Sequence, residues 1–176
     1  LRAHEIPGNL PPELVAPANA AKYAAWLRKH YGPRAHHLGW LPRKSDTPLT
    51  PRLRQSALPL VAVDGADAAL AREARRLARR WLADREAVPP QMRRVVLEAA
   101  ARTAGKDGPA LFDGLVAVAK TTKDQNERED VLNALGQFRD PALGARAFPQ
   151  AFDRADESRG GAEDACEVQP RQSTRP

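Results

Sequence analysis

The chain has 176 residues, a formal net charge of +6 at pH 7, and only 5% aromatic residues. This length allows one domain with appendages, or part of a larger domain. No apolar run approaches the roughly 18 residues of a membrane span, and no signal peptide opens the chain, which leaves the compartment unknown. The single cysteine, Cys166, excludes an internal disulfide and a cysteine-based zinc cage.

The first part of the chain predicts an irregular lead-in and two helices. Prolines exclude a long element from residues 1–16. Apolar spacing then predicts a helix from about Ala18 to Tyr31, ended by Gly32-Pro33. Thr-Pro pairs at 47–48 and 50–51 are typical of helix starts, and they open a second helix whose interior Pro59 should produce a kink. Its inward stripe is expected to be Leu53, Ala57, Leu60 and Val61.

The third predicted helix has the clearest amphipathic pattern. Asp67 can cap its N-terminus, and one face carries Leu70, Ala74, Leu77 and Trp81. The opposite face carries five arginines, here named the arginine stripe: Arg72, Arg75, Arg76, Arg79 and Arg80.

Four further helix starts follow along the chain. A fourth helix begins at Pro89-Pro90 and a fifth runs from about Pro109 to Lys120. Asp124 can cap a sixth helix, and Asp140-Pro141 starts a seventh, whose pattern stops near Phe148.

Together these patterns predict an all-α protein of about six to seven helices. Short connections make the helices antiparallel hairpins, and the hairpins are expected to stack as a HEAT-like superhelix. The predicted division is a lead-in over residues 1–16, a helical-repeat domain over residues 17–149, and a disordered tail over residues 150–176. The tail carries six acids and four bases, which leaves +8 on residues 1–149.

The sequence contains no recognisable catalytic or metal centre. His4-Glu5 resembles the start of the zinc-peptidase motif H-E-x-x-H, but the required second histidine is replaced by Gly8. The adjacent pair His36-His37 cannot share one metal ion from a helix face. No G-x-S-x-G elbow and no glycine-rich phosphate loop is present.

The arginine stripe is the best candidate for a functional surface. Guanidinium groups bind carboxylates and phosphates in a bidentate manner, so the stripe could contact a peptide, an acidic partner or nucleic acid. An amphipathic helix also needs a polar outer face, so a solvated surface explains the same pattern. The sequence has no recognised nucleic-acid motif, and its basic residues are not interleaved with aromatic residues.

An ordered set of short motifs resembles a known family. The set comprises Leu38-Gly39-Trp40, Leu53-Arg54, a helix ending at Trp81, Pro89 followed by Arg93-Arg94-Val95-Val96, and Ala134-Leu135-Gly136 before Asp140-Pro141. It resembles the C-terminal helical domain of zinc aminopeptidases of the aminopeptidase N and endoplasmic-reticulum aminopeptidase type. The resemblance covers roughly residues 20–148.

The resemblance implies a non-catalytic domain of a larger enzyme. In this family an all-α bowl of HEAT-like pairs packs over a zinc-bearing catalytic domain and closes the chamber in which N-terminal residues are removed from peptides. The zinc and substrate motifs lie upstream and are absent here, so no catalytic or metal residue is carried over. Zinc is expected only in the parent's catalytic domain, which is the expected partner together with peptide substrate. The alternatives are a stand-alone interaction module that uses the arginine stripe, and a nucleic-acid-binding domain.

Overall fold

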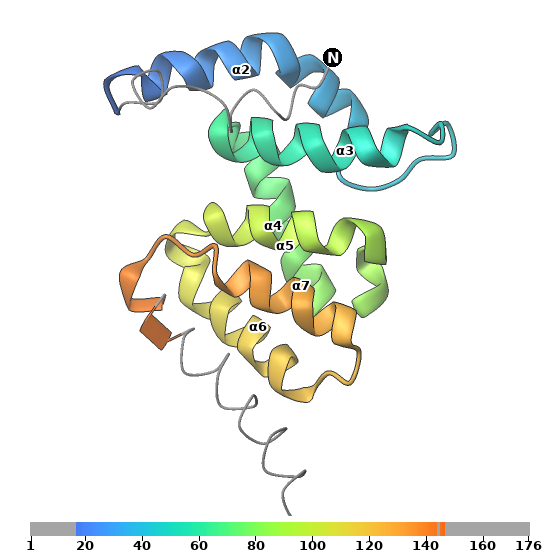
Figure 1. The fold of residues 1–176 in the computed structure, drawn as a ribbon, viewed down its shortest axis with the longest axis vertical. Helices are drawn as coiled ribbons and strands as arrows, with labels where there is room; N and C mark the ends of the chain where they lie inside the picture. Colours follow the sequence, from blue (N-terminus) through green and yellow to red (C-terminus); the bar gives the residue numbers. More distant parts are fainter. Residues whose placement is uncertain (1–16, 144, 147–176) are drawn as a thin grey trace, which may run out of the picture.

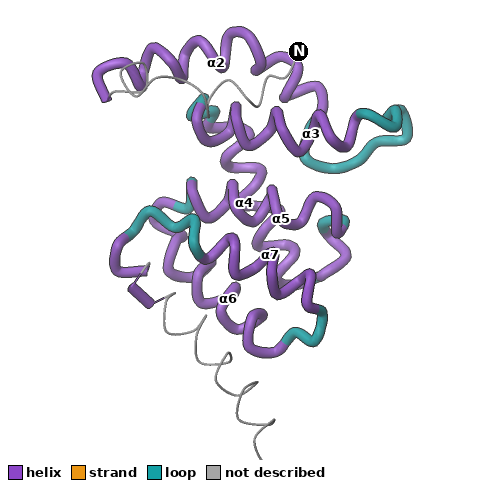
Figure 2. The backbone as a smooth tube through the Cα atoms, in the orientation of Figure 1, coloured by secondary structure: helices purple, strands orange, loops and turns teal. Residues whose placement is uncertain are grey.

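The computed structural model describes residues 17–143 and 145–146 of the chain. In this part every regular element is a helix, and no strand is present (Figure 2). The α-helices are α2 (Pro17–Leu38), α3 (Thr50–Pro59), α4 (Ala68–Ala83), α5 (Pro90–Arg102), α6 (Gly108–Thr121) and α7 (Gln125–Leu135). Short helical turns are the π-helical η1 (Leu60–Asp64) and the 3-10 turns η2 (Arg85–Ala87) and η3 (Gly105–Asp107).

The helices form three stacked pairs. Helix α2 packs against α3 and η1, α4 against α5, and α6 against α7. Between pairs, α3 and η1 contact α5, α5 contacts α7, and α4 contacts α6. Figure 1 shows the pairs as successive tiers, with α2 at one end. The predicted all-α stack of helix hairpins is therefore confirmed.

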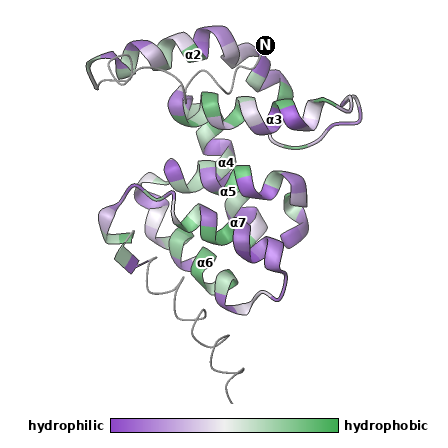
Figure 3. Cartoon of the chain, in the orientation of Figure 1, coloured by the Kyte–Doolittle hydropathy of each residue, from purple (hydrophilic) through white to green (hydrophobic). Residues whose placement is uncertain are grey.

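The core runs through all three pairs and is built from leucine, valine and alanine around a few large rings. Trp40, Trp81 and Phe112 are fully buried. Figure 3 shows hydrophobic residues on α5, α6 and α7 where these helices lie against one another. The Trp40 Nε1–H donates to the carbonyl of Leu70 over 3.1 Å, which joins the loop after α2 to α4. Burying one such ring removes roughly 200 Å² from water, and this is worth several kcal/mol before entropy is subtracted.

The first helix is longer than predicted, because Gly32-Pro33 does not end it. Helix α2 continues to Leu38, and Pro33 lies inside it. The added turns bury Ala35 completely and Leu38 almost completely. A proline removes one backbone hydrogen bond, but its fixed φ is compatible with a helix. The apolar burial of the last turns offsets that loss, and this burial is a tertiary effect that local sequence does not report.

The sequence predicted a kink at Pro59, and in the structure the second helix ends at this residue. Helix α3 stops at this residue, and the chain continues into the π-helical turn η1. There the Gly65 N–H donates to the carbonyl of Leu60 over 2.8 Å, a five-residue interval that widens the helix locally. The expected inward position of Leu53 is wrong, since this side chain is 40% exposed. Arg54 and Leu58 are buried on α3 instead.

The predicted aspartate caps are confirmed, whereas α3 begins at Thr50 after Leu49 and has no side-chain cap hydrogen bond, so the predicted threonine cap is wrong. The Asp67 carboxylate accepts hydrogen bonds from the Ala69 and Leu70 N–H groups. Asp124 caps α7 in the same manner, and Asp140 accepts from the N–H of Ala142. Residues 141–143 are helical, as the start of the seventh helix required. The predicted lead-in, Phe148 and the predicted disordered tail lie outside the described residues.

Candidate functional site

Helix α4 presents the arginine stripe on its outer side. Its inner row, which includes Leu70, Ala74, Leu77 and Trp81, is buried against the neighbouring pairs. The stripe therefore faces away from the core, as the amphipathic pattern predicted. Four of its five side chains are exposed, and the fifth, Arg75, is half-buried.

The structure divides the stripe into engaged and unengaged arginines. Arg75 Nη1 donates to the carbonyl of Thr103 over 2.7 Å, and Arg79 Nη1 donates to Asp107 over 2.7 Å. These two contacts tie α4 to the connection between α5 and α6. Arg76 lies 3.8 Å from Glu73 one turn away. The remaining two side chains, Arg72 and Arg80, make no hydrogen bond or ion pair within the described part of the chain.

A buried arginine that the sequence pattern missed fixes the loop after α2. Arg54 is 0% exposed, and it donates to the carbonyls of Gly39 over 2.8 Å and Leu38 over 3.1 Å. It also pairs with Asp46: Nη2 donates to Oδ1 over 3.1 Å, and Nη1 lies 2.8 Å from Oδ2. The hydrogen bond from Arg54, together with one from the N–H of Arg43, lowers the pKa of the Asp46 carboxyl. The Leu-Gly-Trp and Leu-Arg motifs thus belong to one structural unit.

A second nearly buried arginine joins two helix pairs. Arg93 on α5 is 7% exposed, and its Nε lies 2.7 Å from Asp130 on α7. Its Nη1 lies 3.5 Å from Glu127, which also pairs with Arg85 at 3.5 Å. The acidic residues at the start of α7 therefore serve the packing of α5 against α7. The sequence analysis did not predict this pairing, because Arg93 and Asp130 lie 37 residues apart in the chain.

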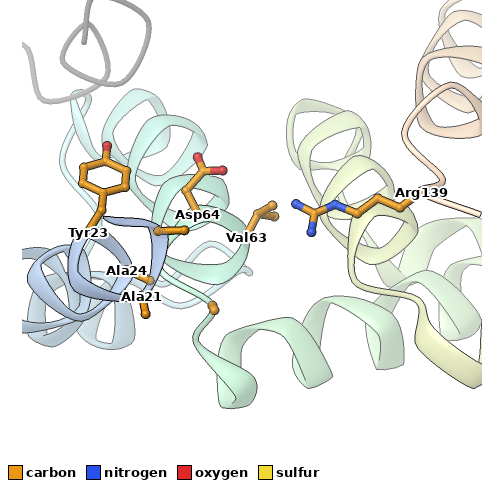
Figure 4. Close-up of a pocket in the computed structure, with 8 residues that line it drawn as sticks. Ala21, Tyr23, Ala24, Val63, Asp64 and Arg139 are labelled. Carbon is orange, nitrogen blue, oxygen red and sulfur yellow. The ribbon is translucent and has the colours of Figure 1, made fainter. Parts of the chain in front are cut away.

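An open cavity of about 500 Å³ lies between α2 and η1. Tyr23 and Ala24 line it from α2, while Asp64 lines it from η1 and Arg139 from the segment after α7 (Figure 4). Burial raises the pKa of Tyr23, and the nearby Asp64 carboxylate raises it further. Asp64 also lies 3.7 Å from Arg102 at the end of α5. The cavity lining thus includes one carboxylate, from Asp64, and one guanidinium group, from Arg139.

A second cavity of about 420 Å³ shares Arg139 with the first. It is also lined by Arg102, Thr103 and Phe138. Since Thr103 accepts the hydrogen bond from Arg75, this cavity adjoins the arginine stripe. The second cavity is thus linked to the first through Arg139 and to the stripe through Thr103. Exposed guanidinium groups in such places are suited to binding carboxylates.

Residues 17–143 and 145–146 contain no cluster of three histidine, cysteine, aspartate or glutamate side chains placed to hold a metal ion. None of the helices described combines the length and apolar character that a membrane span requires.

Three stacked helix pairs with a continuous core define a helical-repeat domain. Residues 13–161 match the sequence profile described as the ERAP1-like C-terminal domain, and the chain belongs to this family of C-terminal domains of M1 aminopeptidases. The chain is also similar to Aminopeptidase M1 of Arabidopsis thaliana, with 32% identity over 111 residues. That alignment covers 62% of this chain and 12% of the relative, so the chain spans a small part of the curated relative's length. No solved structure matches the chain.

Proposed function

We propose that the chain is the non-catalytic lid of a zinc aminopeptidase and forms part of the wall of its substrate chamber. The observation that carries this proposal is the match of residues 13–161 to the ERAP1-like C-terminal domain. The similarity to a protein named Aminopeptidase M1 supports the wider activity. In this proposal zinc and the bond-breaking chemistry reside in the remainder of the longer polypeptide.

The role of this chain is then to bind and enclose peptide. Arg72 and Arg80 have no partner within the described residues, and Arg139 lies at the rim of two cavities. Guanidinium groups of this kind bind the carboxylates of a peptide chain. The engaged side chains, Arg75 and Arg79, hold α4 against the α5–α6 connection and keep this surface in shape.

The first test compares the isolated chain with the longer protein. We expect the longer protein to hydrolyse aminoacyl-p-nitroanilides and to retain about one zinc ion per molecule, while the isolated chain does neither. Metal content by mass spectrometry and initial rates measure both properties. Stoichiometric zinc together with hydrolysis in the isolated chain would contradict the proposal.

The second test addresses the lid role directly. In the longer protein, the double variant Arg72→Ala/Arg80→Ala should raise KM for peptide substrates about tenfold, because two charge-assisted contacts are removed. The KM for a single aminoacyl substrate should stay unchanged, since such a substrate is too short to reach the stripe. Arg52→Ala, which removes an exposed arginine on α3, is the matched control. Equal KM changes for short and long substrates would rule out a peptide contact.

A stand-alone interaction module is the second candidate. The unengaged arginines Arg72 and Arg80 favour it, because they could bind an acidic protein without an enzyme. The gene distinguishes the two proposals: an open reading frame that encodes H-E-x-x-H and runs into Leu1 supports the enzyme. Nucleic-acid binding would require an affinity that falls steeply with salt, because phosphate contacts release counterions.

A further inference from the structure

The outer face of α2 differs from the outer faces of the other helices. Three large hydrophobic side chains are exposed in the described part of the chain, and all three belong to the α2–α3 pair or to the loop between these helices. They are Trp26 on α2 at 41%, Leu49 in the loop at 70% and Leu53 on α3 at 40%. In the pairs α4–α5 and α6–α7 the large hydrophobic side chains are buried or partly buried. An exposed tryptophan at one end of a helical stack marks a surface suited to a partner.

The rings on α2 are already arranged as a platform. Trp26 lies 6.3 Å from Tyr23 in a stacked arrangement and 4.9 Å from His30, measured between ring centroids. Tyr31 meets Trp26 edge-on at 5.7 Å. Positions 23, 26 and 30 lie along one side of a helix. Because neighbouring rings restrain the indole, Trp26 loses little conformational entropy when a partner covers it.

The same helix carries only positive charge. Helix α2 contains four basic residues and no aspartate or glutamate: Lys22, Arg28, Lys29 and Arg34. Arg28 is engaged with the carbonyl of Gly65. The other three are exposed and make no hydrogen bond or ion pair with the described residues. A partner that covers Trp26 therefore meets an aromatic centre with a basic rim.

We propose that the outer face of α2, centred on Trp26, docks an acidic segment of the same longer polypeptide. This inference rests on the proposed function, in which the chain is a small part of a longer protein. The chain likewise aligns with only 12% of its curated relative. A second copy of this chain is a poor occupant, because symmetric pairing through α2 would oppose two helices that each carry four bases and no acid. Charge complementarity instead selects a partner with aspartate or glutamate around an apolar contact.

Photo-crosslinking in the longer protein tests this inference. Trp26 is replaced by p-benzoylphenylalanine, and the cross-linked peptides are identified by mass spectrometry. We expect one acidic peptide from outside residues 1–176. The control places the same group at Ala117, an exposed position on α6, and should not give that peptide. Absence of any cross-link at position 26, or cross-links only to nucleic acid or to a second copy of this chain, would overturn the inference.

A charge-reversal variant separates docking from chance proximity. Lys22→Glu/Lys29→Glu should lower the yield of the position-26 cross-link at least about fivefold, since repulsion replaces attraction. Lys120→Glu on α6 should leave the yield unchanged. An unaltered yield in the double variant would exclude an acidic partner. Zinc content and activity toward short substrates are measured on the same samples. A failed cross-link in an active zinc enzyme rejects only the docking surface, whereas an inactive, zinc-free protein rejects the proposed function.

Discussion

The guanidinium of Arg54 is buried beneath the loop that follows α2, and its Nε donates to the carbonyl of Gly39 over 2.8 Å. Gly39 has a φ of +60°, a conformation that ends α2 and favours glycine. The arginine thus satisfies a carbonyl that the helix leaves free at its C-terminus. Asp46 on the far side of the loop balances the buried charge.

Removing this guanidinium should destabilise the fold strongly. Arg54→Met leaves Asp46 and two loop carbonyls without their partner, and breaking a largely buried pair costs about 3–5 kcal/mol. Urea denaturation followed by circular dichroism measures the change in the free energy of unfolding. Arg52→Ala, an exposed neighbour on the same helix, should change it by less than about 0.5 kcal/mol. Equal effects of the two variants would mean that the buried contacts contribute little.

The two adjacent arginines of α5 should differ in the same assay. Arg93→Ala removes the nearly buried contacts to Asp130 and Glu127, with an expected loss of about 3 kcal/mol. Arg94→Ala removes an exposed pair with Glu98, which is worth about 0.5 kcal/mol. A larger loss for the Arg94 variant would contradict the assigned roles.

Two glycines with nearly the same backbone should respond differently to a methyl group. Gly65 has φ −72° and ψ −11°, and Gly136 has φ −70° and ψ −9°. A Cβ on Gly65 would lie 2.5 Å from the carbonyl oxygen of Val61, so the backbone must shift. Gly65→Ala should therefore cost about 1–3 kcal/mol. At Gly136 the nearest atom lies 3.5 Å away, and Gly136→Ala should be close to neutral. Thermal unfolding of both variants measures the difference.

Acid should unfold the protein in part through Asp46 and Asp67. The pKa of Asp67 is lowered in the folded state: burial opposes the charge, but hydrogen bonds from the Leu70 N–H and from His36 outweigh it. The pKa of Asp46 is lowered as well. A folded pKa below the unfolded value of about 3.9 contributes stability that is present above that pH and is lost as the pH falls through the folded pKa.

We therefore expect urea midpoints that change little through these two groups between pH 7 and 5 and fall below about pH 4. Asp67→Asn, which keeps a capping oxygen but does not titrate, should show a smaller acid-induced loss than the natural chain. The midpoints are compared at constant ionic strength. Identical pH profiles for the two proteins would show that Asp67 does not contribute.

Trp26 should be the accessible tryptophan of the three in the chain. Trp40 and Trp81 are 0% exposed, whereas Trp26 is 41% exposed and lies on a helix with four basic residues and no aspartate or glutamate. Iodide should quench a fraction of the fluorescence efficiently, because the anion is attracted to α2, and caesium should quench it weakly. Trp26→Phe should remove the quenchable fraction. Efficient iodide quenching that persists in this variant would contradict the burial of the other two indoles.

The local pattern was sufficient where one helix face decided the outcome. The inward row of α4 and the caps at Asp67 and Asp124 follow from side chains within one or two turns of each other. The Arg94–Glu98 pair is also such a local contact. The ordered motifs also led to the family, because their spacing is a property of the chain alone.

Other features depended on contacts between residues far apart in the chain. The continuation of α2 through Pro33 required burial of Ala35, and the inward position of Arg54 required the loop carbonyls of residues 38 and 39. The arginine stripe was visible in the sequence, but its division was not, since Arg75 and Arg79 bind groups 28 residues away. The exposure of Trp26 likewise depends on which helix lies at the end of the stack.

Residue spacing and ordered motifs were enough to predict the helical class, most helix starts and the family. Which arginines are buried, which are engaged and which remain available to a partner followed from long-range contacts alone. In an isolated helix a guanidinium can be solvated or paired with a neighbour, so the helix does not select its role. Its role is selected by the carbonyl or carboxylate that folding brings within hydrogen-bond distance, as Thr103 is brought to Arg75.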